Sequence, residues 1–269
     1  MKGFTEGITT ENKSIAIAIK DMREVFSSVS IYGPMIGVPM FFAIALPFLT
    51  VYVALHAAPS IASRIAAGAV SGVSPSQINS LSFMYFFAIN VLGPIFLTIP
   101  IFTASVIAAD SFAGEKERKT SENLLAAPIT NGELLLGKIL ASLIPTIVLT
   151  VAVFGIYGAT VNFLSFQEFG TYILPTPTWI MMLASAPLLA LAAIAVVVFV
   201  SAHVKGIKEA QQISTLLVLP ILLIPFISIL GIANLNVSFF AYAIVVLCVV
   251  DSVIFYISVK DFKKEKILY

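Results

Sequence analysis

Six long apolar segments constrain this chain more than any other feature of its sequence. Each is close to the ~20 residues that an α-helix needs to cross the hydrocarbon core of a bilayer. Only 11% of the 269 residues are charged, against about 25% in soluble domains, so the chain lacks the polar surface to cover a water-soluble core. We therefore predict an all-α membrane protein, one transmembrane domain over residues 1–269, with spans at about residues 32–55, 81–109, 139–161, 179–202, 213–232 and 238–259.

The basic residues mark one side of the membrane. Of the 15 lysines and arginines, all but Arg64 lie before the first span, between the second and third spans, between the fourth and fifth, or after the sixth. Cytoplasmic loops are enriched in lysine and arginine, so both termini and these two loops are expected in the cytoplasm. The N-terminal stretch is too charged, and the apolar run after it too long, for a cleaved signal peptide. We predict a multi-pass protein of the cell membrane with a retained N-terminus.

An amphipathic helix is expected just before the first span, over about residues 15–30. At 100° per residue one arc of this helix is apolar and the opposite arc is charged. The apolar arc contains Ile15, Ile19, Met22, Phe26 and Val29, and the charged arc contains Lys13, Lys20 and Glu24. Such a helix fits the headgroup plane of a membrane. The alternatives are a helix packed on a soluble partner or the start of the first span.

A phosphate-binding motif is matched only superficially. Residues Gly132 to Lys138 fit the first seven positions of a P-loop. However, Ile139 replaces the Ser or Thr that would coordinate magnesium, and no strand precedes the motif. Thr130 and Glu133 instead have the spacing of a helix capping box. Neither histidine has acidic or cysteine neighbours, and no nucleophile–base set is visible. We predict no metal site, no bound cofactor and no enzymatic activity in this chain.

Two features lie inside the predicted spans. Asp251 is the only acidic residue well within a span, where a charge costs about 2.5–3.5 kcal/mol on insertion scales. It is expected to face the bundle, to be protonated, or to pair with a polar group such as Asn90. It either contacts a coupling ion or a substrate, or is structural. In the fifth span, Pro220 and Pro225 either break the helix into a movable or re-entrant piece or only shape the bundle.

The longest polar stretch between two spans covers residues 110–138. We expect the second span to continue to about Arg118, and Thr120 or Ser121 to cap a short helix that ends at Pro128. Two adjacent leucines give this helix an apolar patch with a charged rim. A helix of this kind, over residues 115–128, suits docking into a groove on another protein. The alternative is a solvated connector that rests on the membrane surface.

These residues resemble a known family. Ala113 to Pro128 reads AGEKERxTxExLLxxP and is followed by ELLLGK from Glu133 to Lys138. The pattern resembles the membrane subunits of type-2 ATP-binding cassette exporters, and among them the sodium- and drug-efflux permeases. Lys208 to Gln212 is similar to that family's second cytoplasmic loop, and Lys20 to Glu24 to its connecting helix.

The resemblance implies a permease subunit that exports a substrate with ATP hydrolysed elsewhere. The segment at 115–128 would be the coupling helix seated on the ATPase subunit, and ATP and magnesium would bind that subunit. The other expected partners are a second permease copy or homologue and membrane lipid, not nucleic acid. The predicted docking residues are Glu115, Glu117, Arg118, Thr120, Glu122, Leu124, Leu125, Pro128, Lys208, Glu209 and Gln211.

The main alternative is a secondary transporter driven by an ion gradient through Asp251. In both cases Asp251 and Asn90 are candidates for the translocation path. No matched pair of interrupted spans and no internal repeat is visible in the sequence, which argues against the alternative. The predicted cavity is largely apolar and suits hydrophobic drugs, lipids or peptides better than ions.

Overall fold

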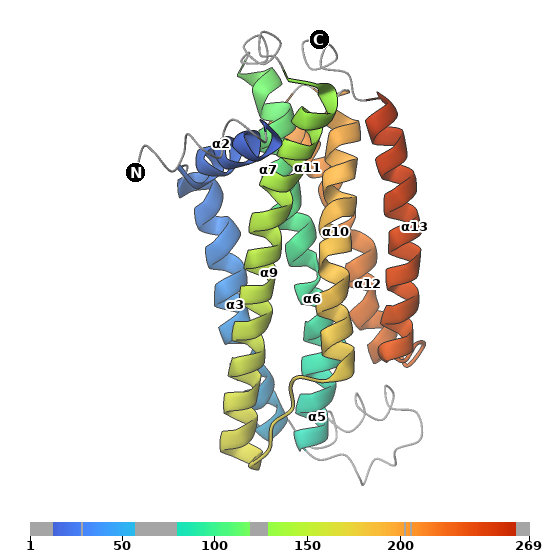
Figure 1. Ribbon diagram of the computed structural model, residues 1–269. Helices are drawn as coiled ribbons and strands as arrows, with labels where there is room; N and C mark the ends of the chain where they lie inside the picture. The colour runs from blue at the N-terminus through green and yellow to red at the C-terminus, as the bar shows by residue number, and fades with distance from the viewer. Residues whose placement is uncertain are drawn as a thin grey trace.

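The computed structural model describes residues 13–27, 29–56, 80–118, 129–201, 203–204 and 206–261, which form a helical bundle (Figure 1). Six helical stretches are long and apolar enough to cross a membrane, which confirms the predicted all-α, six-span architecture. In chain order the elements are α2 (Lys13–Ser27), α3 (Val29–His56), α5 (Ser80–Phe86), the π-helix η2 (Phe87–Leu92), α6 (Gly93–Phe96), α7 (Thr98–Glu117), α9 (Asn131–Phe169), α10 (Pro177–Ser201), α11 (Ile207–Thr215), α12 (Val218–Ile229) and α13 (Val237–Asp261).

Helix α9, the third span, is much longer than predicted. Its 39 residues extend over about 58 Å at 1.5 Å per residue, whereas the hydrocarbon core of a bilayer is about 30 Å thick. The helix begins after Thr130 instead of near residue 139 and continues to Phe169, into the stretch expected to be an outer loop. Its polar ends stay helical because buried side chains such as Leu134 and Leu164 keep their helical spacing there. Gly170, with φ of 69°, ends the helix.

The second span lies at the centre of the bundle. Its helices are the most buried of the six spans, whereas α12 and α13 are the least buried. An aromatic cluster joins the second span to α9 and α10. The ring of Phe96 lies 4.6 Å from that of Tyr157, which stacks on Trp179 at 5.1 Å, and Phe154 lies 4.6 Å from Trp179. All four side chains are buried.

The second span is not one continuous helix. It changes from α5 to the π-helix η2, then to the single turn α6, and Leu97 separates α6 from α7. Pro94 lies at the start of α6, where a missing backbone N–H is tolerated. The wider turn of the π-helix presents the carbonyl of Ala88, which accepts a hydrogen bond from the Tyr157 hydroxyl at 3.0 Å.

The fifth span is also broken, at Leu216 and Leu217 between α11 and α12. Pro220 falls in the first turn of α12, so the break before it is the predicted one; Pro225 lies inside α12 without ending it. Helix α12 packs against η2, α6 and α7, so the two broken spans are neighbours. The expectation that no two spans form a matched interrupted pair stays a prediction, because residues 80–115 still form one helical stretch long enough to span the membrane. The interruption in the second span was missed because a π-helix keeps a helical sequence pattern.

Helix α2 lies across the bundle axis at one end (Figure 1). The amphipathic helix is thus present, although it ends at Ser27 and α3 begins at Val29. The face that packs on the bundle contains Ser14, Ala18, Asp21 and Val25 rather than the apolar arc. Ile15 and Phe26, which belong to that arc, are exposed. The location of this helix in the headgroup plane stays a prediction, and the exposed apolar arc is consistent with it.

Candidate functional site

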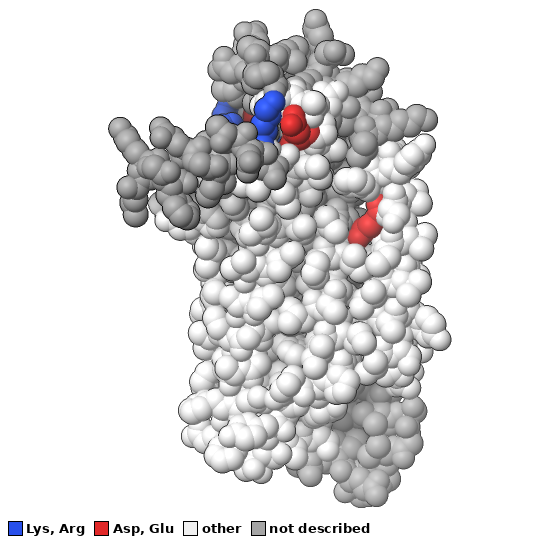
Figure 2. Space-filling view, in the orientation of Figure 1, with Lys and Arg blue, Asp and Glu red and all other residues white. Residues whose placement is uncertain are grey.

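The end of the bundle on which α2 lies collects most of the charged side chains visible in Figure 2. We call it the charged end: it comprises α2, residues 110–118 at the end of α7 and in the turn after it, residues 129–138 before and in α9, and the start of α11. The predicted docking residues that the structure describes all lie here. It therefore combines the sequence-predicted contact surface with ion pairs that the sequence did not reveal.

A fully buried lysine lies at the centre of the charged end. Lys138, in the second turn of α9, has an exposed fraction of 0%. Its ammonium donates to the carbonyl of Ser111 and lies 2.9 Å from Glu115 Oε1 and 3.4 Å from Asp21 Oδ2. It also lies 5.4 Å from the centre of the Phe112 ring. A buried charge requires such partners, because desolvation would otherwise force it to neutralise.

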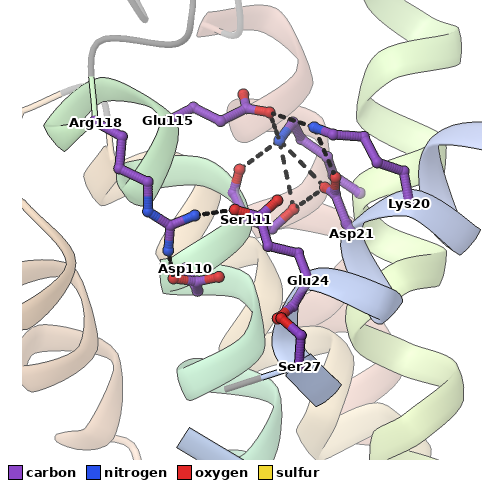
Figure 3. Close-up of polar contacts among 9 residues, drawn as sticks. Lys20, Asp21, Glu24, Ser27, Asp110, Ser111, Glu115 and Arg118 are labelled. Atoms are coloured by element: carbon purple, nitrogen blue, oxygen red, sulfur yellow. Dashed lines mark hydrogen bonds and ion pairs between the residues drawn. The ribbon is translucent and has the colours of Figure 1, made fainter.

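The partners of Lys138 come from two other helices, so this one ammonium connects α9 to both α2 and α7. The Ser111 hydroxyl of α7 donates a hydrogen bond to Asp21 of α2 (Figure 3). Lys20 adds a second cation, 3.4 Å from Asp21 and 3.8 Å from Glu115. Two ammonium groups thus face two carboxylates. We call Lys20, Asp21, Ser111, Glu115 and Lys138 the lysine cluster.

Electrostatics favour the charged form of Lys20. Burial opposes the charge, but the carboxylates of Asp21 and Glu115 outweigh it and raise the pKa of Lys20 above its ordinary value. A raised lysine pKa stabilises the folded state fully below the unfolded pKa of about 10.4, and this contribution is lost only as the pH rises above that value. Lys20 is therefore charged at neutral pH.

A second ion-pair group lies beside the lysine cluster. Arg118, in the turn after α7, pairs with Asp110 of its own helix and with Glu24 of α2 (Figure 3). Asp110 is buried, whereas Arg118 and Glu24 are partly exposed. The guanidinium offers several donors in a fixed plane, so one side chain reaches both carboxylates. The last residue described before 119–128 is thereby attached to α2.

The false P-loop motif has a structural explanation. All of Gly132 to Lys138 lies within α9, so no loop exists there to hold a phosphate. A Cβ on Gly137 would come within 2.7 Å of the Ser14 carbonyl oxygen, so glycine permits α2 to cross α9 closely. The predicted capping box is confirmed: Thr130 N donates to Glu133 Oε2 at 2.8 Å, and Glu133 N donates to Thr130 Oγ1 at 3.2 Å.

Glu117 joins the end of α7 to the start of α11. Its Oε2 accepts a hydrogen bond from the backbone N–H of Ile207 at 2.9 Å, at the N-terminus of α11. A carboxylate there satisfies an otherwise unpaired N–H and interacts favourably with the helix dipole. Gly206 is required for this approach, since a Cβ at that position would lie 2.7 Å from the same oxygen.

The structure divides the predicted docking residues into three groups. Glu117, Arg118, Lys208 and Glu209 are exposed at the charged end, and Gln211 is partly buried. Glu115 is buried in the lysine cluster, so its side chain contacts α2 and α9 rather than the outer surface. The remaining members lie outside the described residues; they are Thr120, Glu122, Leu124, Leu125 and Pro128. The docking role of the whole set stays a prediction.

Sequence reasoning missed the lysine cluster, although a signal was present. Lys138 precedes Ser142 and Thr146 at four-residue spacing, and all three are fully buried on one face of α9. A lysine on a buried helix face needs a carboxylate, and the acidic residues of α2 and α7 were available. Lys208 and Glu209, expected in a loop, lie instead on the short helix α11, whose Ala210 and Ser214 are buried.

Asp251 and Asn90 are not brought together. Asp251 lies on α13, which packs mainly on α10, and its exposed fraction is 9%. Neither carboxylate oxygen has a hydrogen-bond donor within the parts of the chain that the structure describes, so the suggested pair with Asn90 does not form. Asn90 lies in η2, on the broken second span. Asp251 does face the bundle, as one of the expectations stated.

Comparison with known proteins agrees with a multi-pass membrane protein. Residues 15–250 match the model of the ABC-2 family transporter protein family. The chain is also 32% identical over 133 residues to the ABC transporter permease protein NatB of Bacillus subtilis (strain 168). That alignment covers 48% of this chain and 34% of NatB. Because the family match takes in most of the chain, from the first turn of α2 into the sixth span, this multi-pass membrane protein belongs to the ABC-2 transporter family.

Proposed function

We propose that the chain is the permease subunit of an ATP-binding cassette exporter in the cell membrane. The charged end would receive a separate ATPase subunit, which would bind ATP and magnesium, and a second permease copy or homologue would complete the translocation path. Family membership supports the general class. The lysine cluster is the observation that carries the mechanism, because it connects three helices at the end where the predicted coupling helix begins and ends.

The proposed coupling follows from how segment 119–128 is held. It leaves α7 at Arg118, which pairs with Glu24 of α2, and the chain re-enters the bundle at the capping box of α9. Both attachment points are fixed to each other through Lys138. A force applied to the segment by an ATPase subunit would therefore act on α2, α7 and α9 together. Glu117 would extend the same motion to α11 and the broken fifth span.

The path for the substrate would run beside the two broken spans. Interrupted helices expose backbone groups and permit local rearrangement, and in transporters they mark binding sites. Asn90 lies in the interrupted part of the second span, against which α12 packs. We infer that Asn90 contacts the substrate during transport. Asp251 would contact the substrate from α13, on the side where α13 packs on α10.

The proposal is tested by reversing charges at opposite ends of the bundle. Glu209 is exposed at the charged end, and Glu168 is exposed near the other end of α9. With the purified ATPase subunit, Glu209→Lys should weaken binding by about tenfold or more, equivalent to about 1.4 kcal/mol, whereas Glu168→Lys should leave it unchanged. Leu124→Ala should lower ATP-dependent transport in vesicles. Equal binding by both charge-reversal variants, with normal transport by Leu124→Ala, would refute docking at the charged end.

An ion-gradient-driven transporter is the second candidate. The buried carboxylate of Asp251 and the pair of broken spans are the observations in its favour. This candidate predicts transport by the chain without any ATPase subunit, abolished by a protonophore or by Asp251→Asn. The exporter predicts that transport requires ATP and the ATPase subunit and survives collapse of the ion gradient.

A further inference from the structure

An apolar groove separates α3 from the second span. Helix α3 packs along α9 and α5, and its prolines Pro34 and Pro39 lie where it faces α6 and α7. The groove between them has a volume of about 410 Å³. This volume falls within the range of about 300–1,000 Å³ that is typical of small-molecule sites.

The groove has a buried floor and exposed rims. Phe96 and Ile99 form the floor, with exposed fractions of 2% and 7%. The rims are aromatic: Phe42 of α3 is 44% exposed and Phe102 of α7 is 38% exposed. A molecule on the floor would therefore have one phenylalanine on each side. This arrangement distinguishes the groove from an ordinary lipid-facing helix surface, where apolar side chains project without a floor between them.

The chemistry of the walls selects a neutral ligand. Every described side chain that lines the groove is uncharged. The one polar member, Thr98, already donates its hydroxyl to the Ile95 carbonyl at 2.7 Å. An ion or a charged headgroup would lose its hydration here without replacement, at a prohibitive free-energy cost. The groove therefore suits the hydrocarbon part of a molecule.

The dimensions select a narrow ligand. The groove follows α3 from Pro34 to Leu46, a length of about 18 Å at 1.5 Å per residue. A volume of about 410 Å³ distributed over this length makes an elongated groove, which suits an extended ligand. Pro34 lies close to the start of α3, so the groove is in the half of the bundle nearer the charged end.

We propose that this groove binds the transported molecule, and that the substrate class is a narrow, neutral, largely apolar compound taken up from the bilayer. The identification of this ligand as the transported substrate rests on the proposed function. Its binding to the groove does not require an ATPase subunit. In its chemistry the groove agrees with the largely apolar cavity that the sequence analysis expected.

The chain contains its own reporter for this site. Trp179 is its single tryptophan, and it stacks on Tyr157, which contacts Phe96 on the groove floor. A brominated molecule in the groove would quench Trp179 at short range. The probe is 4-bromobiphenyl, which is neutral, narrow and aromatic, added to the permease alone in lipid nanodiscs.

Two variants carry the same valine-to-phenylalanine substitution, one in the groove and one outside it. Val38→Phe would fill the groove at its rim, whereas Val148→Phe makes the same change at an exposed position of α9 outside the groove. The proposal expects saturable quenching in the wild type and in Val148→Phe, and only the linear background in Val38→Phe. Phe42→Ala, which removes a rim without filling the groove, should shift the half-saturating concentration upward by about tenfold. Unchanged thermal unfolding of each variant would show that it folds normally.

Two results would overturn the proposal. Quenching that rises linearly with probe and is equal in all variants would mean that only probe dissolved in the bilayer is detected. In nanodiscs made with dibrominated-acyl phosphatidylcholine, strong quenching that 4-bromobiphenyl does not change would assign the groove to lipid chains. No ATPase subunit is present in this experiment, so its result does not depend on whether the charged end docks an ATPase. Likewise, a failure of the probe to bind the groove would not contradict docking at the charged end.

Discussion

Lys138 and Asp251 are both ionisable residues buried in long apolar helices, yet their surroundings are opposite. Lys138 has carboxylates from α2 and α7 within 3.4 Å and a backbone carbonyl as a further acceptor. Asp251 has no hydrogen-bond donor for either oxygen in the described chain. The charge of Lys138 is part of the architecture of one end of the bundle, whereas that of Asp251 is not compensated by the described residues. Buried charge alone therefore does not identify a role; its partners do.

The largest effect is expected from removing the compensated charge. Lys138→Met keeps the length of the side chain but removes the buried ammonium from the buried carboxylates of Asp21 and Glu115, while the exposed Lys20 stays beside both. Breaking a buried ion pair in this way costs about 3–5 kcal/mol. We expect a lower thermal unfolding midpoint for the permease in nanodiscs and faster hydrogen exchange in α2.

Two further variants test whether the loss arises from the stranded carboxylates. Lys208→Met changes an exposed lysine at the same end and should leave the unfolding midpoint unchanged. Adding Asp21→Asn and Glu115→Gln to Lys138→Met should restore part of the lost stability. No restoration in the triple variant would mean that Lys138 acts through packing rather than charge.

Removing the uncompensated charge of Asp251 should raise the stability of the protein instead of lowering it. Asp251→Asn is expected to raise stability by up to about 2.5–3.5 kcal/mol, the penalty for aspartate near the centre of a span. Asp21→Asn, at a similarly buried carboxylate, is expected to lower it. Thermal unfolding of the two variants side by side provides the measurement. Equal destabilisation by both would show that Asp251 has a partner in the assembled protein.

The sequence predicted the spans better than the site, for physical reasons. Hydrophobicity over about 20 residues is a local property, so the six spans and the capping box of Thr130 could be found directly. The lysine cluster joins Asp21 to Ser111 and Lys138, which lie 90 and 117 positions away, and no local pattern encodes these contacts. The π-helix in the second span was missed because it keeps a helical side-chain pattern. The resemblance identified Lys20–Glu24 only as similar to a connecting helix, without its contacts to α7 and α9.

The close approach of α2 to α9 offers a smaller test of the charged end. Alanine usually stabilises a helix by about 0.5–1 kcal/mol relative to glycine, and Gly155→Ala in open space on α9 should follow this rule. Gly137→Ala should instead destabilise by about 1–3 kcal/mol, because its Cβ would meet the α2 backbone at 2.7 Å. The comparison uses thermal unfolding of two variants with the same substitution in the same helix. A stabilising effect at both positions would mean that α2 does not pack closely there.

The smallest effect concerns the contact between α7 and α11. Glu117→Ala removes the acceptor for Ile207 N–H and should cost about 0.5–2 kcal/mol, as for loss of a helix N-cap. Glu117→Gln keeps an oxygen acceptor and loses only the charge at the N-terminus of α11, worth about 0.3–1 kcal/mol. Hydrogen exchange of α11 measures both. If the contact transmits motion to the broken fifth span, ATP-dependent transport should fall more than stability does, and more for alanine than for glutamine. A loss of transport equal in the two variants would assign the role of Glu117 to its charge, and hence to the ATPase surface, instead of to the cap of α11.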